Sequence, residues 1–149
     1  MFIETIKLLF ERDLNKLINE IEQYQNESDI WMINKNISNS AGNLCLHLMG
    51  NLHTYIGAII GGTNYIRNRE LEFSLKNIPR KNLLASIKAT KAMVHQSLDK
   101  LTEAQLNAEY PILVLAEKTS LMFFLAHLTT HLSYHLGQIN YHRRLLGSD

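Results

Sequence analysis

Hydrophobic residues recur at three- and four-residue steps along four stretches of this chain, and that spacing places them on one face of an α-helix. Polar and charged residues fill most positions between them, as in a helix that has one face against a core and the other in water. The four stretches cover about residues 2–24, 40–60, 80–101 and 120–146. The pattern therefore predicts four amphipathic helices.

Residues that start and stop helices stand at the ends of these stretches. Serine and threonine side chains accept hydrogen bonds from the first free amides of a helix, proline fits at its start, and glycine commonly ends it. The signals are Ser38 or Ser40 before the second stretch, Gly61 and Gly62 after it, Pro79 before the third, and Thr119 or Ser120 before the fourth. They agree with the hydrophobic pattern.

Two long connections separate the predicted helices, residues 63–79 and residues 102–117. The first is longer than a simple helix connection needs, so we expect it to border a functional site, with most of its charges solvated. In the second, the apolar run Ile112–Leu115 is expected to pair briefly as a strand. Four helices with two long crossings predict an all-α four-helix bundle, a fold in which metal sites are built from facing side chains.

The length and hydrophobic content favour a single domain over residues 1–149. Of the 149 residues, 46% are hydrophobic, which is enough for one core and short for two. Trp31 is expected to tuck under the bundle, with a partner-binding surface position as the alternative. Gly50 and Gly57 weaken the second helix by about 1 kcal/mol each relative to alanine. We therefore expect them to mark a close helix approach, within the chain or across a dimer.

Composition and charge argue against several classes of function. The formal net charge is +1 and basic residues are spread along the chain, so no nucleic-acid footprint is visible. The most apolar run, Leu44–Ile60, is interrupted by polar residues and falls short of the roughly 20 residues that span a bilayer. The first residues lack the features of a secretory signal, so a cytoplasmic protein is expected. The lone Cys45 is expected to be a buried, inert thiol rather than a reactive one.

Four of the seven histidines lie in the last predicted helix. At about 100° per residue they share with one glutamine a stripe roughly 80° wide, on or beside the apolar face. The stripe consists of His127, His131, His135, Gln138 and His142. A buried imidazole without a partner costs about 1–3 kcal/mol, and a metal ion would supply that partner. The alternative is that these side chains are partly exposed and bonded to water and to each other.

His131 and His135 are four residues apart, so they stack on adjacent turns and can chelate one cation. Two ligands are too few, and a third must come from another helix. His47 lies on the apolar side of the second helix and can reach the interior beside the last helix. Taken alone, a structural role at the border of the core is the alternative for this residue. His53 falls on another side and is expected at the surface, and His95 is expected to be exposed.

Three separated segments match a known family in order. They are residues 40–52 (SAGNLCLHLMGNL), residues 61–73 (GGTNYIRNRELEF) and residues 135–139 (HLGQI). Together with His47 and the His131-x-x-x-His135 pair, they make the chain resemble the DinB-like (YfiT-like) family of four-helix-bundle proteins over most of its length. Many members of that family carry arginine where this chain has Leu136.

The resemblance implies a metal site. In that family a histidine of the second helix and the paired histidines of the last helix bind a divalent metal, typically zinc or nickel, and leave positions for water or substrate. The ligands implied here are His47, His131 and His135. Some relatives are thiol-cofactor transferases or isomerases and others have no assigned activity, so fold and resemblance do not transfer a reaction. The family habit and the glycines of the second helix lead us to expect a homodimer.

Two classes of function follow. The first is a metalloenzyme that transfers a low-molecular-weight thiol to an electrophilic small molecule, with metal-assisted hydrolysis as the next candidate. Gln138 is its candidate pocket residue, with an ordinary interhelical hydrogen bond as an equal alternative. Asn51 is expected mainly as an interhelical hydrogen-bonder, with orientation of a bound group as the alternative. His127 and His142 are expected in pocket or supporting positions rather than as ligands. The second class is a non-catalytic homodimeric bundle whose metal is structural or senses a ligand. It is favoured by the absence of a carboxylate from the histidine stripes.

Overall fold

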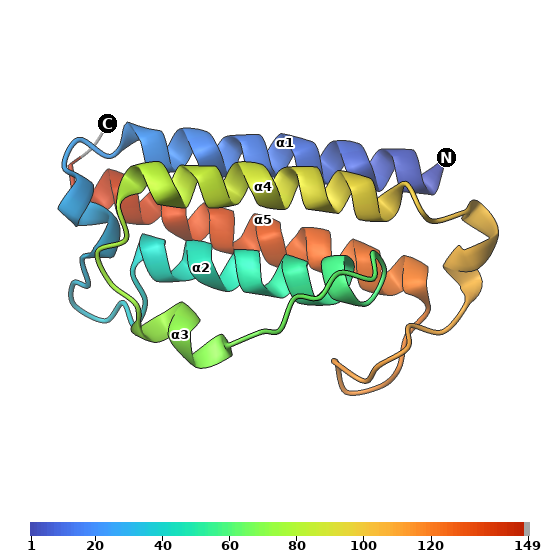
Figure 1. The fold of residues 1–149 in the computed structure, drawn as a ribbon. Helices are drawn as coiled ribbons and strands as arrows, with labels where there is room; N and C mark the ends of the chain where they lie inside the picture. Colours follow the sequence, from blue (N-terminus) through green and yellow to red (C-terminus); the bar gives the residue numbers. More distant parts are fainter. Residues whose placement is uncertain (148–149) are drawn as a thin grey trace.

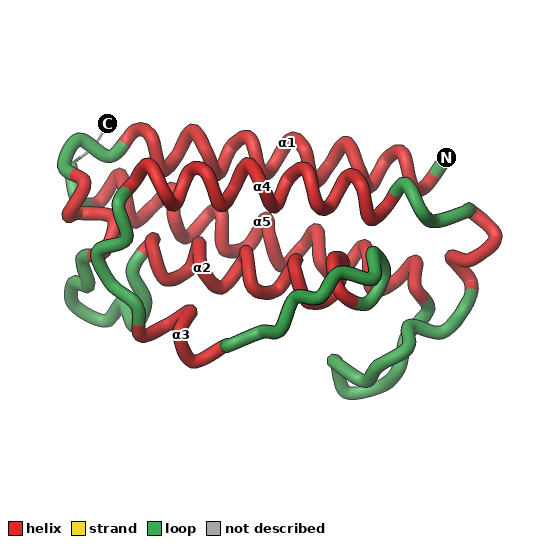
Figure 2. Tube along the Cα trace, in the orientation of Figure 1, coloured by secondary structure: helices red, strands yellow, loops and turns green. Residues whose placement is uncertain are grey.

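Four long helices lie side by side in the computed structural model, which describes residues 1–147 (Figure 1). They are α1 (Phe2–Gln23), α2 (Ala41–Leu52), which continues as the π-helical segment η2 (His53–Ala58), α4 (Arg80–Leu98) and α5 (Leu121–Leu145). The shorter elements are the 3₁₀ turns η1 (Glu27–Trp31) and η3 (Glu103–Asn107) and the helix α3 (Arg69–Ser74). Figure 2 shows helices joined by loops, and no strand forms within the described residues. The predicted all-α bundle is confirmed.

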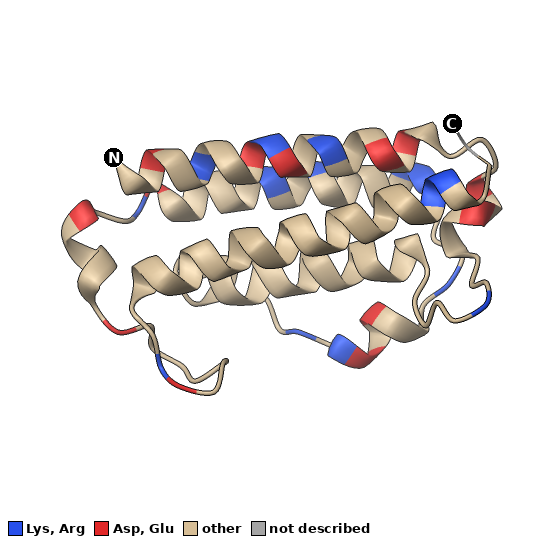
Figure 3. Ribbon diagram, turned by 180° about the vertical axis from the view of Figure 1, so that it is seen from behind, with Lys and Arg blue, Asp and Glu red and all other residues tan. Residues whose placement is uncertain are grey.

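The helices form one hydrophobic core from their apolar faces. α1 packs against α4 and α5, α2 packs against α5 and α4, and α3 lies on α2. The largest side chains that are almost fully buried include Phe10, Tyr24, Leu48, Tyr110 and Phe124. Charged residues line α1, whereas α2 has none and α5 has none before Arg143 (Figure 3). Any carboxylate near the histidines of α2 and α5 must therefore come from another element.

The sequence predicted two possible cap residues for each of the helices α2 and α5, and in the structure one of each pair forms the cap. The Ser40 hydroxyl accepts a hydrogen bond from the Asn43 amide at 3.1 Å and starts α2. The Ser120 hydroxyl accepts from the Phe123 amide at 3.1 Å and starts α5. Because each cap satisfies an otherwise unpaired amide, the two histidine-bearing helices begin at defined residues.

The second helix changes from α to π geometry at His53. The Gly61 amide bonds to the Ile56 carbonyl, five residues back, at 2.9 Å. His53 was predicted at the surface, and this prediction is wrong: its ring lies 5.0 Å from that of Tyr65, and its Nε2 is 3.0 Å from the Thr90 hydroxyl. The residue is half-buried because the 63–68 segment and α4 cover a side of α2 that the pattern left to solvent.

The long connections differ from the sequence-based expectation. Residues 63–79 contain α3, whose first turn is capped by Asn68. The strand predicted at Ile112–Leu115 does not form, because Val114 and Leu115 pack against the core instead of leaving the segment extended for pairing. An isolated bridge between Glu109 and Ser120 joins the two ends of this loop. The loop is thereby closed without any strand within the described residues.

Two predictions about single buried residues are confirmed. Trp31 is 7% exposed and lies so close to Gly42 that a Cβ there would be 2.6 Å from its ring. Cys45 is fully buried, and burial raises the pKa of its thiol to about 12. His95 is exposed, as predicted. Within residues 1–147, no helix has the length and apolar character needed to cross a membrane.

Candidate metal centre

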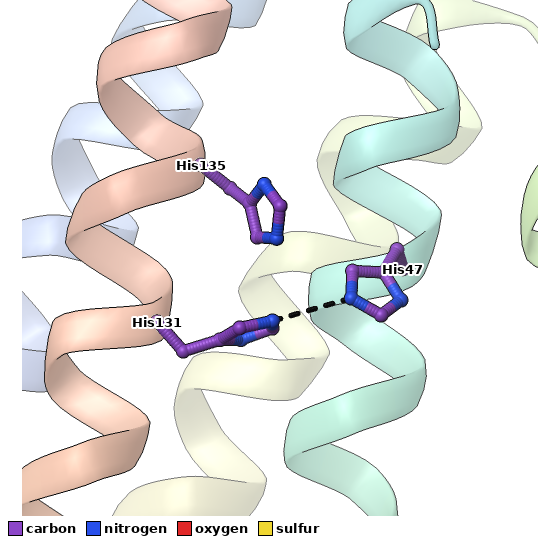
Figure 4. A group of neighbouring side chains, drawn as sticks. All are labelled: His47, His131 and His135. Atoms are coloured by element: carbon purple, nitrogen blue, oxygen red, sulfur yellow. Dashed lines mark hydrogen bonds between the residues drawn. The ribbon is translucent and has the colours of Figure 1, made fainter. Parts of the chain in front are cut away.

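Three imidazoles converge between α2 and α5 (Figure 4). His131 and His135 extend from successive turns of α5, and His47 faces them from α2. One ring nitrogen from each residue lies within 4.8 Å of the other two. Nε2 of His47 and Nε2 of His131 are 3.2 Å apart. The tertiary fold thus brings together the three residues singled out in the sequence.

The three rings differ in exposure and stand at steep angles to one another. His47 is buried, and the two residues of α5 are half-buried. The planes of His131 and His135 meet at 88°, and those of His47 and His135 at 89°. Because the rings do not stack, their in-plane lone pairs can point to one position. That position is enclosed on the side of the buried His47 and is nearer to solvent on the side of the half-buried His135.

A carboxylate holds the ring of His47. The Nδ1–H of His47 donates to Oε1 of Glu72 at 3.0 Å, and Arg67 donates to both Glu72 oxygens at 2.8 and 2.9 Å. Since the proton is on Nδ1, the lone pair of Nε2 is directed at the cluster. Burial lowers the pKa of His47, while Glu72 opposes that shift. The imidazole is therefore oriented and neutral, as metal ligation requires.

The side-chain amide of Gln138 orients the ring of His135. Nδ1 of His135 lies 2.7 Å from Oε1 of Gln138, one turn further along α5. A carbonyl oxygen can only accept, so the proton is on Nδ1 and Nε2 carries the lone pair. Gln138, expected as a pocket residue, is thus placed behind a candidate ligand. Its side chain is exposed and also borders a cavity next to His135.

His131 has no such support. Its Nδ1 is buried and has no hydrogen-bond partner within residues 1–147. Because Nε2 of His47 is an acceptor, the 3.2 Å contact between the two rings requires a proton on Nε2 of His131. Burial, followed by the neighbouring imidazoles, lowers the pKa of His131 to about 4. The His131 ring is therefore uncharged near neutral pH. A cation bound between the three rings would take the place of the hydrogen bond between His131 and His47.

The residues fit a divalent transition metal. Zinc–nitrogen bonds of about 2.0–2.1 Å in tetrahedral geometry place ligand nitrogens about 3.4 Å apart. The 3.2 Å between the ring nitrogens of His47 and His131 is close to that spacing. All three ring nitrogens lie within 4.8 Å of one another, so a small rotation of the His135 ring would bring its nitrogen to the same spacing. Three neutral imidazoles suit zinc, nickel, copper and iron. The donor set therefore supports a metal without choosing among these ions.

Sequence reasoning missed Glu72 and Arg67. Both were grouped with charges expected to be solvated, yet Glu72 is 5% exposed and bonds to His47 across 25 residues of sequence. The available signal was Gly50: a Cβ at this position would overlap the Glu72 carboxylate. A Cβ at Gly57 would lie 2.9 Å from the Met93 sulfur. The close approach predicted for both glycines is therefore made within the chain.

The remaining stripe residues lie outside the cluster. The ring of His127 is 6.4 Å from that of His131, centre to centre. His142 is buried; its Nδ1 accepts from the Tyr24 hydroxyl at 2.6 Å, and its Nε2–H donates to a backbone carbonyl, that of Met32, at 2.8 Å. The interhelical hydrogen bond expected of Asn51 is missing for its side-chain oxygen, which is buried without a partner among the described residues.

The fold and the cluster define a helical-bundle protein with a candidate three-histidine metal site. The chain belongs to the family described as protein of unknown function (DUF1572), whose sequence profile matches residues 1–149. No curated protein matches the chain. The three-histidine cluster is the feature that this chain has in common with the DinB-like proteins it resembles.

Proposed function

We propose that this protein is a divalent-metal-dependent enzyme that holds zinc or nickel through His47, His131 and His135 and acts on a small molecule. The observation that carries the proposal is the convergence of three ring nitrogens within 4.8 Å beside an open cavity. Three protein ligands leave further coordination positions for water or substrate, as in catalytic rather than structural zinc sites. A structural site would instead be closed by a fourth protein ligand.

The reaction we favour is transfer of a low-molecular-weight thiol to an electrophile. A bound divalent metal lowers the pKa of a thiol or water and polarises an acceptor group. Within residues 1–147, Glu72 is the one carboxylate that contacts a cluster histidine, and it is already bonded to Arg67 and His47. Without a free general base, a nucleophile that ionises readily is favoured, and hydrolysis remains second.

The protein's own groups would prepare the site before substrate arrives. Glu72 and Gln138 hold protons on the far nitrogens of His47 and His135, which keeps the near nitrogens available. Burial keeps the His131 ring uncharged near neutral pH. These contacts support a site in which the ligand nitrogens of His47 and His135 are available before the metal binds, whereas the proton on Nε2 of His131 has to leave that nitrogen on binding.

Metal analysis of protein prepared without a metal-binding tag tests the proposal. We expect close to one transition-metal ion per chain in the parent by elemental mass spectrometry, and a large loss in His47→Ala, His131→Ala and His135→Ala. His95→Ala, which changes an exposed histidine, should retain the parent content. Absence of metal after reconstitution with zinc and nickel would contradict the proposal.

Catalysis is tested by reacting low-molecular-weight thiols with electrophiles in the presence of metal-loaded and chelated protein. Turnover should require the metal, and activity unchanged by its removal would contradict the thiol-transferase assignment.

A second candidate is a non-catalytic homodimer whose metal is structural or senses a ligand. It is favoured by the location of the cluster, which would cross-link α2 to α5. A large fall in melting temperature on chelation, without turnover on any substrate class, would support this candidate. Sedimentation analysis measures the oligomeric state and so tests whether this candidate forms a dimer.

A further inference from the structure

A cavity of about 510 Å³ adjoins the histidine cluster on one side. His135 belongs to both. The other residues of α5 that line it are Tyr134, Gln138, Tyr141, His142 and Leu145, and residues 36–39 form the opposite wall. This segment and the end of α5 lie at the same end of the bundle (Figure 1). The cavity therefore extends from the cluster toward the C-terminal end of α5.

The lining mixes apolar and polar side chains, with Ile37, Leu44 and Leu145 among the apolar ones, and it carries no acidic or basic residue among those described except histidine. Asn36, Ser38 and Asn39 offer hydroxyl and amide groups from the loop, and the rings of Tyr134 and Tyr141 stand on the helix side. None of the described residues that line it is a lysine, arginine, aspartate or glutamate. His142 also borders it, but both of its ring nitrogens are bonded within the protein.

Charged groups near the cavity do not contribute to its wall. Arg143 is buried with Glu20, which accepts from its Nε at 2.6 Å. Arg144 is exposed and lies over the ring of Tyr141 at 5.4 Å from the ring centre. A charged group placed against this wall would find no acidic or basic side chain of opposite charge in it. An uncharged group would keep hydrogen bonds to the amides and hydroxyls.

We propose that this cavity binds the non-reacting part of the substrate, and that this part carries no charge. It is either a flat ring or a group with hydroxyls and amides. The reactive end, a thiol under the proposed function on which this inference depends, extends past His135 to the cluster. A volume of this size accommodates a small organic molecule. The tyrosine rings and the loop amides select for such a part by contact and hydrogen bonding.

Two thiols that differ only in charge test the proposal on cobalt-loaded protein. The pair is para-(mercaptomethyl)benzamide and para-(mercaptomethyl)benzoate, whose para substituent is too far from the sulfur to bind the same ion. Binding is followed by the thiolate-to-cobalt absorption band, which does not depend on turnover. We expect the neutral amide to bind roughly fivefold or more tightly than the benzoate, because the wall offers hydrogen-bonding groups to the amide but no cation to the carboxylate.

Variants then locate the non-reacting part of the thiol. Tyr141→Ala and Asn39→Ala should weaken binding of the benzamide severalfold while leaving cobalt affinity and the binding of ethanethiol, which lacks the ring, unchanged. Phe123→Ala removes an equally exposed aromatic side chain near the other end of α5 and should have no effect. Arg144→Gln should leave the preference for the neutral thiol in place.

The outcomes separate this inference from the proposed function. If both aromatic thiols bind with equal affinity, or if the cavity variants bind the benzamide as the parent does, the inference is wrong and the thiol chemistry stands. If cobalt binds but no thiol produces the absorption band, the thiol chemistry is wrong and this inference fails with it.

Discussion

At the scale of single residues, the candidate site depends on where protons lie on three imidazoles. Glu72 and Gln138 each accept a hydrogen bond from the Nδ1–H of a histidine, His47 and His135 respectively. His131 donates to His47 and keeps a buried nitrogen without a partner within the described chain. Residues outside the cluster thus determine the orientation and proton position of the His47 and His135 rings. For His131, the contact with His47 within the cluster determines them.

Glu72→Gln is expected to weaken metal binding by about 10- to 100-fold, the usual effect of removing a supporting carboxylate. The glutamine oxygen can still accept from His47, but the charge and the bidentate pair with Arg67 are lost. Competition titration with a chelator measures the affinity. Glu70→Gln, an exposed change on the same helix, should leave it unaltered. Equal affinity in both variants would show that Glu72 does not support the site.

Tyr24→Phe separates a structural histidine from the ligands. The change removes the donor to His142 and leaves a buried acceptor unpaired, which costs about 1–3 kcal/mol of stability. Denaturant unfolding should show this loss, while metal content stays at the parent level. Tyr134→Phe, at an exposed tyrosine, should change neither quantity. Loss of metal in Tyr24→Phe would place His142 in the site and contradict its structural role.

At the scale of elements, α3 brings the carboxylate to the site because α2 has a glycine where the two meet. The Glu72 side chain occupies the space that a Cβ at Gly50 would fill. A six-residue helix has little stability of its own, so its placement depends on this contact and on hydrogen bonds from Asn43 to the carbonyls of Glu72 and Leu75, both 2.9 Å.

Gly50→Ala is therefore expected to lower metal affinity and to destabilise the protein by about 1–3 kcal/mol, the usual cost of overpacking. The intrinsic gain of about 1 kcal/mol from alanine in a helix does not offset it. Gly57→Ala is the matched control, because the flexible end of Met93 can move aside. Thermal unfolding and metal titration of both variants measure the difference. Identical behaviour would mean that Glu72 is not held by this contact.

At the scale of the whole molecule, burial of several histidines makes stability depend on pH. Burial lowers the pKa values of His47, His53 and His131 below 6.5. The unfolded chain binds more protons than the folded chain between that value and the pKa of His131, about 4. The stability linked to these groups is present above about pH 6.5 and is lost as the pH falls toward about 4.

The denaturation midpoint of metal-free protein should accordingly fall across that window. His131→Gln should flatten the dependence, and His95→Gln, at an exposed position, should leave it as in the parent. Guanidinium unfolding at a series of pH values measures both. A midpoint that rises with acidification would contradict the assignment of neutral, buried imidazoles.

The extent to which the sequence predicted the site depends on the distance over which each contact acts. Within one helix, the four-residue step between His131 and His135 fixes their relation, and apolar spacing shows which face is buried. The side of α2 that carries His47 follows from the same periodicity. Pairing Glu72 with His47 depends instead on the path of the 63–79 connection, which no local spacing encodes.

The sequence by itself determined the four long helices, the caps of the second and last of them up to one alternative each, and the two neighbouring histidines of the site, because these follow from backbone geometry and side-chain period. Only the tertiary structure decided that α3 covers His47, that His53 is half-buried and that Ile112–Leu115 remains a loop. These features depend on which segments meet across the bundle. Such long-range contacts are set by packing of the whole core, and local sequence patterns do not specify them.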